Sequence, residues 1–159
     1  MMIQALYNIV MFFYVFVASL HFVLKHRTFE GLVEKWGRIP FRLQSNHQQS
    51  SLIWLHAVSV GELQLAKRLF EEIKNRHDAA SFLITVSTPA AREIAKEWTD
   101  PRLCMSYLPY DFGPIIYRWL DGIRPKQAII LETEIWPNMI WALHQRGVRC
   151  HIVNGRISE

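Results

Sequence analysis

The sequence predicts an α/β fold in which a doubly wound parallel sheet follows an N-terminal apolar helix. Residues 3–24 contain no charged side chain. After residue 51, short apolar runs of strand length alternate with amphipathic runs of helical period. Strands that alternate with helices are joined by crossovers, which produce a parallel sheet with helices on both faces. The 159 residues have room for one ordinary domain.

The apolar run at residues 3–24 is the first predicted element. As a helix, about 22 residues extend roughly 33 Å, enough for the hydrocarbon core of a bilayer. No basic residue precedes this run, whereas Lys25, His26 and Arg27 follow it directly. A cleavable signal peptide has basic residues before its apolar run and small residues after it. We therefore expect residues 1–24 to be a membrane anchor whose C-terminal side faces the cytoplasm, with a buried core helix as the alternative.

Residues 25–50 mix basic side chains with Phe29, Trp36 and Phe41. Such a segment can lie on an anionic membrane surface, with its aromatic rings among the headgroups. The net charge of +4 alone is compatible with nucleic acid or membrane. Because basic residues gather directly after the apolar run, we expect a membrane surface and no nucleic acid. The polar stretch at 44–51 has no periodicity, so the domain boundary is expected near Ser51.

Five strands and four helices are expected from residue 51 onward. The strands are placed at 51–58, 81–87, 102–109, 127–132 and 148–154, and the helices at 62–76, 90–98, 115–123 and 139–147. Pro89 suits a first helical turn, and Gly147 suits a helix C-terminus. No G-x-G-x-x-G or P-loop motif is present. Cys104 and Cys150 fit no metal spacing and are expected to be reduced.

Polar and ionisable residues follow the predicted carboxyl ends of the strands, where parallel sheets bind ligands. Glu62 follows the first strand, in the first turn of a helix. It is either a favourable partner of the helix dipole or a working acid/base. Glu132 and Glu134 follow the fourth strand, where two carboxylates can share acid and base work or simply cap the next helix. Arg156, after the fifth strand, can hold a phosphate or lie on the surface. His56, inside the first strand, is expected to be a hydrogen-bonded core histidine.

Four motifs resemble one family when they are read in order after the apolar segment. They are WLHAVSVGE, LPYD, LETEIWPN and VNGRISE, and they resemble the bacterial 3-deoxy-D-manno-octulosonic acid (Kdo) transferases of lipopolysaccharide synthesis. The resemblance extends through essentially the whole chain. It implies a Rossmann-like parallel sheet that forms the N-terminal half of a two-domain GT-B glycosyltransferase. It also implies transfer of Kdo from CMP-Kdo to the lipid A precursor, lipid IVA, without a metal or other cofactor, at the cytoplasmic face of the inner membrane.

The resemblance also implies roles for individual residues. Glu62 would be the general base, Gly61 before it would let the acceptor approach the backbone, and Glu132 and Glu134 would also be catalytic. From their places at the predicted strand ends, the residues expected to bind substrate are Ser59, Gly61, Thr88, Asn154 and Arg156. The chain departs from the family at Ala90 and Ala91, where Thr and Gly are usual after Thr-Pro.

The chain ends at Glu159, inside the last motif. Residues 51–159 are therefore expected to be the acceptor-side domain, truncated and without the donor domain, and inactive in transfer by themselves. A catalytically silent, membrane-anchored binding or scaffold module is the alternative function.

Overall fold

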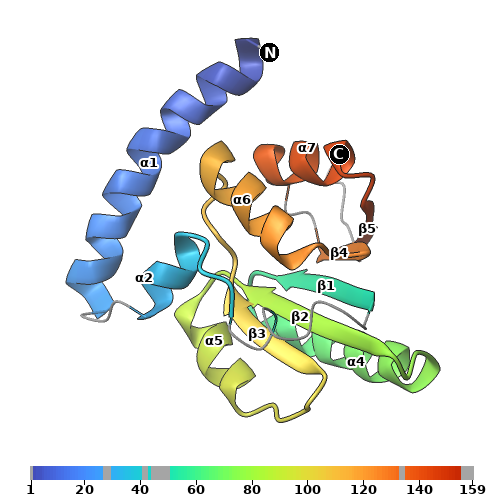
Figure 1. Cartoon of the computed structure of the whole chain (residues 1–159). Helices are drawn as coiled ribbons and strands as arrows, with labels where there is room; N and C mark the ends of the chain where they lie inside the picture. Colours follow the sequence, from blue (N-terminus) through green and yellow to red (C-terminus); the bar gives the residue numbers. More distant parts are fainter. Residues whose placement is uncertain (1, 27–29, 41–42, 44–50, 133–134, 155–159) are drawn as a thin grey trace.

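All five predicted strands lie in one parallel sheet, in the order β3-β2-β1-β4-β5 (Figure 1). The structure is a computed structural model that describes residues 2–26, 30–40, 43, 51–132 and 135–154. The chain builds the sheet outward from β1 to β3 and then crosses back to place β4 on the other side of β1. The strands are β1 (Ser51–Ala57), β2 (Ala80–Val86), β3 (Leu103–Tyr107), β4 (Gln127–Leu131) and β5 (Arg149–Val153).

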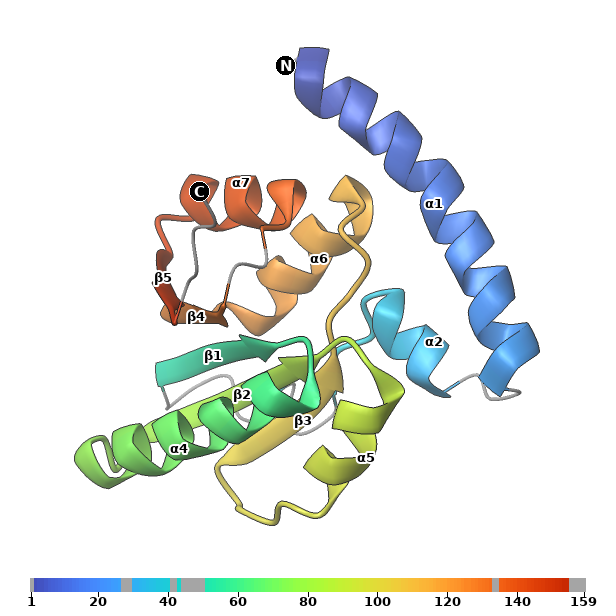
Figure 2. The same ribbon diagram turned by 180° about the vertical axis from the view of Figure 1, so that it is seen from behind.

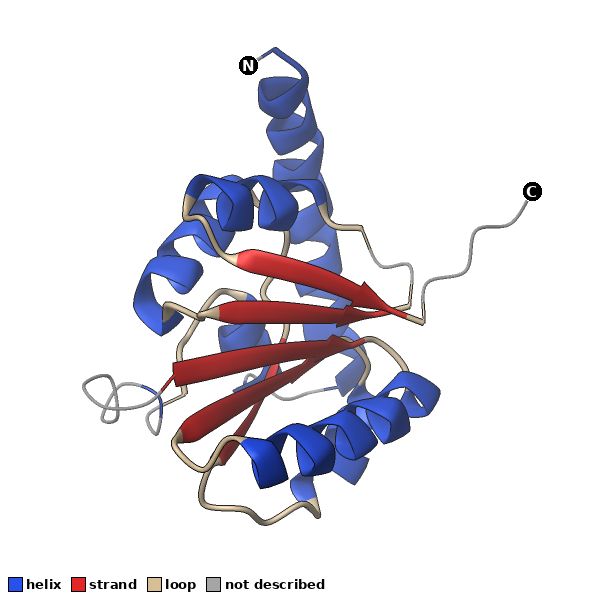
Figure 3. Ribbon diagram, turned by 90° about the vertical axis from the view of Figure 1, so that its right-hand side faces the viewer, coloured by secondary structure: helices blue, strands red, loops and turns tan. Residues whose placement is uncertain are grey.

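Helices cover both faces of the sheet, as the alternating pattern predicted. One face packs against α4 (Val60–Arg76) and α5 (Pro89–Lys96), and the other against α6 (Gly113–Ile123) and α7 (Pro137–Gln145). Figures 2 and 3 show the two pairs on opposite sides of the strands. The helices begin one or two residues earlier than the sequence indicated, because the turn residues and prolines before them belong to the first turns. The predicted Rossmann-like fold class is confirmed.

The central strand β1 has side chains buried on both faces of the sheet, which explains its continuous apolar run. Leu55 and Ala57 point to the cluster under α4 and α5, whereas Trp54 points to the cluster under α6 and α7. There the Trp54 ring meets the Trp119 ring edge to face, at 5.1 Å between centroids. The edge strand β5 is exposed at all but its last residue.

Among the described residues before the sheet lie the helices α1 (Met2–His26) and α2 (Glu30–Lys35). By length and composition α1 can cross a membrane, but a signal sequence passes the same test. The short helix α2 was not anticipated; it packs against β3, where Glu34 accepts a 2.7 Å hydrogen bond from the backbone N–H of Tyr107. Part of the predicted segment 25–50 therefore contacts the sheet, while the boundary near Ser51 stays a prediction.

Candidate functional site

The turn between β1 and α4 is closed by a reciprocal capping box. The Ser59 hydroxyl accepts a 3.3 Å hydrogen bond from the backbone N–H of Glu62 and donates a 2.8 Å bond to Glu62 Oε1. The Glu62 carboxylate also accepts bonds from the backbone N–H of Val58, at 2.7 Å to Oε2, and of Ser59, at 3.3 Å to Oε1. Such a box satisfies N–H groups that a helix start leaves unpaired. Glu62 therefore does cap the helix, which was one of its two predicted roles.

The Glu62 carboxylate nevertheless retains capacity for a ligand. It is only 6 % exposed, and the three bonds from Val58 and Ser59 use three of about four lone-pair positions. Next to it, Gly61 is exposed and has an ordinary φ. A Cβ placed on Gly61 would meet nothing nearer than Ser59 Oγ at 3.9 Å. No packing contact of the described residues requires a glycine here, so the free space beside Glu62 is open to an incoming molecule.

The turn between β2 and α5 joins the first turn directly. The Thr88 hydroxyl caps α5 by accepting a 3.3 Å bond from the Ala91 N–H, and it donates a 3.3 Å bond to the carbonyl oxygen of Val58. Thr88 thus holds the two strand ends together. In this geometry its side chain positions the turn that carries Glu62.

Lys35 of α2 reaches the same edge of the sheet, which was not predicted. Its Nζ donates a 3.2 Å bond to the carbonyl oxygen of Ser87 and lies 4.7 Å from the centre of the Tyr107 ring. Burial lowers the pKa of Lys35 to about 8, and the neighbouring Glu34 carboxylate partly offsets that shift. A helix of six residues shows no clear periodicity, so no sequence signal could have placed this cation.

The ends of β4 and β5 have unusual backbone conformations. Glu132 has φ 62° and Asn154 has φ 59°, both in the left-handed region that non-glycine residues rarely occupy. The N–H of Glu132 donates a 2.8 Å bond to the carbonyl oxygen of Val153, which links the two strand ends. Strained residues of this kind are frequent at functional sites. Glu134 and Arg156 lie outside the described residues, so their predicted roles stay predictions.

The turn between β3 and α6 carries a buried carboxylate, Asp111 of the LPYD motif, which was not among the predicted site residues. Asp111 is 2 % exposed and accepts hydrogen bonds from the Tyr7 hydroxyl and from the backbone N–H groups of Asn138 and Met139. Burial raises the pKa of Asp111 to about 6, and the three hydrogen bonds partly offset the rise. Its partners come from α1 and the start of α7, so Asp111 joins three separate elements.

His56 is a core histidine, as predicted. Its Nδ1 lies 3.0 Å from Thr85 Oγ1, and burial lowers its pKa to about 4, so the ring is neutral at pH 7. Within the described residues, no group of three or more His, Cys, Asp or Glu side chains is arranged to hold a metal ion.

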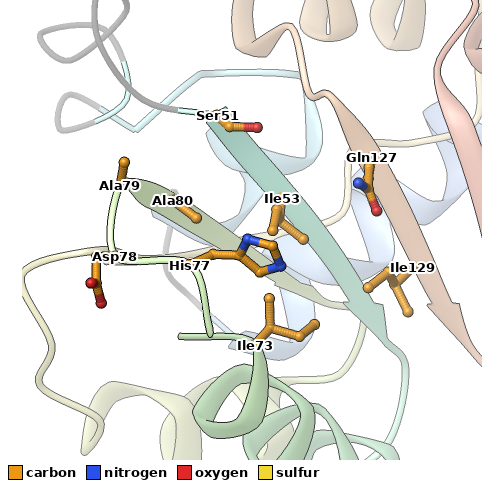
Figure 4. Close-up of a pocket in the computed structure, with 9 residues that line it drawn as sticks. All are labelled: Ser51, Ile53, Ile73, His77, Asp78, Ala79, Ala80, Gln127 and Ile129. Carbon is orange, nitrogen blue, oxygen red and sulfur yellow. The ribbon is translucent and has the colours of Figure 1, made fainter. Parts of the chain in front are cut away.

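A groove of about 530 Å³ lies at the opposite edge of the sheet, where the strands begin (Figure 4). Ser51, Ala80 and Gln127, the first residues of β1, β2 and β4, line it together with Ile73 of α4. Ligands of open parallel sheets bind at the carboxyl ends of the strands. This groove is therefore separate from the edge that carries Glu62, Lys35 and Glu132.

Comparison with known proteins identifies the family. Residues 30–159 match the family described as 3-deoxy-D-manno-octulosonic-acid transferase (kdotransferase). The chain belongs to the Kdo transferase family. A Kdo transferase of Haemophilus influenzae is 35 % identical over 67 % of this chain, and one of Chlamydia pneumoniae is 28 % identical over 99 % of it. A probable mitochondrial Kdo transferase of Arabidopsis thaliana is 30 % identical over 87 % of the chain.

The matches cover most of this chain but only a minor part of each relative's length. The chain covers 25 % of the Haemophilus influenzae protein, 32 % of the Arabidopsis thaliana protein and 38 % of the Chlamydia pneumoniae protein. The family match includes α2 and the whole sheet, so Lys35 and Glu62 lie inside it and α1 lies before it.

Proposed function

We propose that this chain forms the acceptor side of a glycosyltransferase that moves Kdo from CMP-Kdo to the lipid A precursor, lipid IVA. Its membership in the Kdo transferase family supports the reaction class. The observation that supports the site most directly is the buried Glu62 carboxylate beside the exposed Gly61, at the carboxyl edge of a parallel sheet. A carboxylate with one free lone pair and open space next to it suits a hydroxyl group.

In the proposed mechanism Glu62 is the general base. An acceptor hydroxyl donates to the free lone pair of the carboxylate and gives up its proton as its oxygen attacks the anomeric carbon of Kdo. The bond from that carbon to the phosphate oxygen of CMP breaks, and CMP leaves with the electron pair. A single displacement of this kind inverts the anomeric centre. Val58 and Ser59 fix the carboxylate by their hydrogen bonds, so its orientation is set before the acceptor arrives.

The negative charge of the departing CMP needs positive partners, and the sheet edge offers two kinds. Lys35 places a cation beside Ser87, and the helices α4 to α7 each begin at this edge with their N-terminal dipoles toward it. These groups support a reaction that needs no bound metal or other cofactor. We propose that Glu132 and Glu134 are also catalytic. The proposed substrate-binding residues are Ser59, Gly61, Thr88, Asn154 and Arg156, of which Arg156, like Glu134, lies outside the described residues.

We further propose that the protein acts at the cytoplasmic face of the bacterial inner membrane, with α1 as its anchor. The apolar composition of α1 and the basic residues after it support attachment to an anionic membrane surface. Lipid IVA would then reach the sheet edge from the same membrane.

A chimeric enzyme tests the catalytic proposal. Residues 1–159 replace the matching part of the Haemophilus influenzae relative, and transfer from CMP-Kdo to lipid IVA is measured at saturating acceptor. Glu62→Gln should lower kcat by about 10²–10⁴-fold, because a positioned base contributes that much. Asp100→Asn is the control, since it removes the ion pair with Lys74 at the far edge of the sheet and should cost stability alone. A loss below about tenfold for Glu62→Gln would leave Glu62 as a helix cap.

A binding assay and a transfer assay together distinguish this proposal from the alternative, a catalytically silent binding module. Residues 1–159 should bind lipid IVA in mixed detergent micelles, and the chimera should also turn it over. Binding without any turnover by a folded chimera would favour the binding module, and loss of both would contradict the acceptor role.

A further inference from the structure

Helix α1 contacts the rest of the protein along one face and over most of its length. Near its start, Gln4 Nε2 donates a 2.9 Å bond to the Tyr117 hydroxyl. In its middle, Met11 and Val15 are buried against Ile115 of α6. Near its end, the Phe22 ring meets the Tyr107 ring at 6.3 Å between centroids. From residue 4 to residue 22 this contact extends about 27 Å along the helix axis.

The contact includes a buried polar network rather than apolar packing alone. The Tyr7 hydroxyl donates a 2.8 Å bond to Asp111 Oδ2. Asn8 Oδ1 accepts bonds from the backbone N–H of Gly113, at 2.8 Å, and from Asn138 Nδ2, at 3.0 Å. Asp111 and Asn138 are both buried, so withdrawal of α1 would remove several of their hydrogen bonds at once.

The backbone around α6 is shaped for this contact. A Cβ at Gly113 would lie 2.9 Å from Asn8 Oδ1, closer than real Cβ contacts allow. The Gly113 N–H is also the first helical donor of α6, which has no side-chain cap from its own N-cap residue Phe112. Asn8 of α1 therefore satisfies a donor that the local sequence leaves open.

These contacts conflict with a helix that crosses a bilayer. The hydrocarbon core is about 30 Å thick, close to the length over which α1 touches the domain. If α1 crossed with Lys25 at the near surface, Tyr7 and Asn8 would lie close to the far surface. Their partners Asp111, Gly113 and Asn138 belong to the folded α/β domain, which cannot enter the hydrocarbon.

The opposite face of α1 is apolar, and none of the residues that the structure describes covers it. Residues 2–24 include no charged side chain. Large apolar side chains project from this face, each at least 63 % exposed: Ile3, Leu6, Phe13, Phe16, Val17 and Leu24. Soluble monomers rarely expose contiguous apolar surface on this scale. Figure 1 shows that no other element of the described structure covers this outer side of the helix.

Basic and aromatic side chains lie beside the apolar face of α1. Trp36 is exposed and donates a 3.1 Å bond from its indole N–H to Ser19 Oγ of α1. Arg118 donates a 3.2 Å bond to the Trp36 carbonyl oxygen, and Lys25 and Arg38 are exposed nearby in the sequence. Tryptophan and cationic side chains next to an apolar helical face are typical of helices that lie in the headgroup layer of anionic membranes.

We propose that α1 does not span the membrane but lies in the plane of one leaflet, with its outer face among the acyl chains and its inner face on the domain. The partner of this surface is an anionic phospholipid layer. This inference rests on the membrane association proposed above and specifies its geometry. It places the carboxyl ends of β3 and β4, which α1 touches through Tyr107, Asp111 and Asn138, against the headgroups.

The test uses residues 1–159 bound to vesicles of phosphatidylglycerol and phosphatidylethanolamine, with Cys104 and Cys150 replaced by alanine. Asn8→Cys combined with Asn138→Cys is oxidised by oxygen with a copper catalyst. We expect a disulfide in most vesicle-bound chains. Ile9→Cys combined with Asn138→Cys is the matched control, and we expect no disulfide because Ile9 lies on the exposed face.

A second variant leaves the polar network intact. Met2→Cys, at the exposed start of α1, is treated with a membrane-impermeant maleimide outside vesicles that carry the domain on their outer surface. We expect labelling within about twofold of that in detergent.

Labelling of Met2→Cys only after detergent is added, with no disulfide between positions 8 and 138, would overturn the proposal in favour of a spanning helix. A chain that forms the disulfide but does not float with vesicles would overturn lipid as the partner, and a concentration-dependent dimer would then identify a second copy. The Glu62 transfer assay fails or succeeds independently of these readouts.

Discussion

The replacement Gly61→Ala should change stability and activity in opposite directions. Gly61 lies in the first turn of α4 with an ordinary φ, and its Cβ would have open space. Alanine lowers the conformational entropy of the unfolded chain relative to glycine, which stabilises a compatible site by about 0.4–1 kcal/mol. For a chain of this size that corresponds to a rise in Tm of about 1–4 °C. The same methyl group would occupy the space that we propose for the acceptor. Extra methyl groups in a packed contact cost about 1–3 kcal/mol, so kcat/KM for lipid IVA should fall by about 5- to 160-fold.

Two measurements separate these effects. Thermal unfolding of residues 1–159, followed by circular dichroism, gives the change in Tm, and the chimeric enzyme gives kcat/KM for lipid IVA. Gln64→Ala, at an exposed position of the same helix, is the control and should raise Tm slightly with full activity. If Gly61→Ala raised Tm and kept full transfer, the acceptor would not approach Gly61, and the proposed site beside Glu62 would be refuted.

Three further predictions concern strain, pH and the attachment of α2. Glu132→Gly should raise the free energy of unfolding by about 0.5–1 kcal/mol, because it relieves the backbone strain at φ 62°, and it should lower the rate of transfer. Arg124→Gly, at φ 47°, is the control and should raise stability without a change in transfer. Equal transfer activity in the two variants would contradict a catalytic role for Glu132. The Asp111 carboxyl, with a pKa of about 6, binds its proton more tightly in the folded protein than in the unfolded chain. Urea unfolding should therefore show stability falling as the pH rises from about 4 to 6, and this dependence should shrink in Asp111→Asn. Glu34→Gln should cost about 1–3 kcal/mol in urea unfolding, since it weakens bonds from Arg92 and the Tyr107 N–H; a cost below about 0.5 kcal/mol would show that Glu34 does not hold α2.

The sheet and its helices could be predicted because local pattern and global topology agree. β1 is apolar on both faces, α4 has its apolar residues on one side, and a polar turn separates the two elements. The same alternation implies crossovers and therefore a parallel sheet. The carboxyl edge follows from topology, so the sequence alone is enough to place Glu62 and Thr88 at the same edge of the sheet.

The position of α1 and the role of Lys35 could not be predicted in this way. Both depend on contacts between residues far apart in the sequence, such as Asn8 with Asn138 and Lys35 with Ser87. Mean hydropathy averages over all the side chains of α1, so it does not reveal that Gln4, Tyr7 and Asn8 share one face and form hydrogen bonds with the α/β domain. Likewise, a first-turn glutamate after serine predicts a capping box, but only the structure shows how much of the Glu62 carboxylate that box uses.

The fit of Asn8 against Gly113 has a consequence for how related sequences change. The two positions are separated by 105 residues, yet a side chain on one occupies the space that a Cβ on the other would need. Substitutions at positions 8 and 113 should therefore be correlated among related sequences. Lineages that keep glycine at position 113 can retain an amide at position 8, whereas those that acquire a Cβ at 113 should show a smaller residue at 8. A family tree annotated at these two positions would reveal whether the helix and the domain have been inherited as one packed unit.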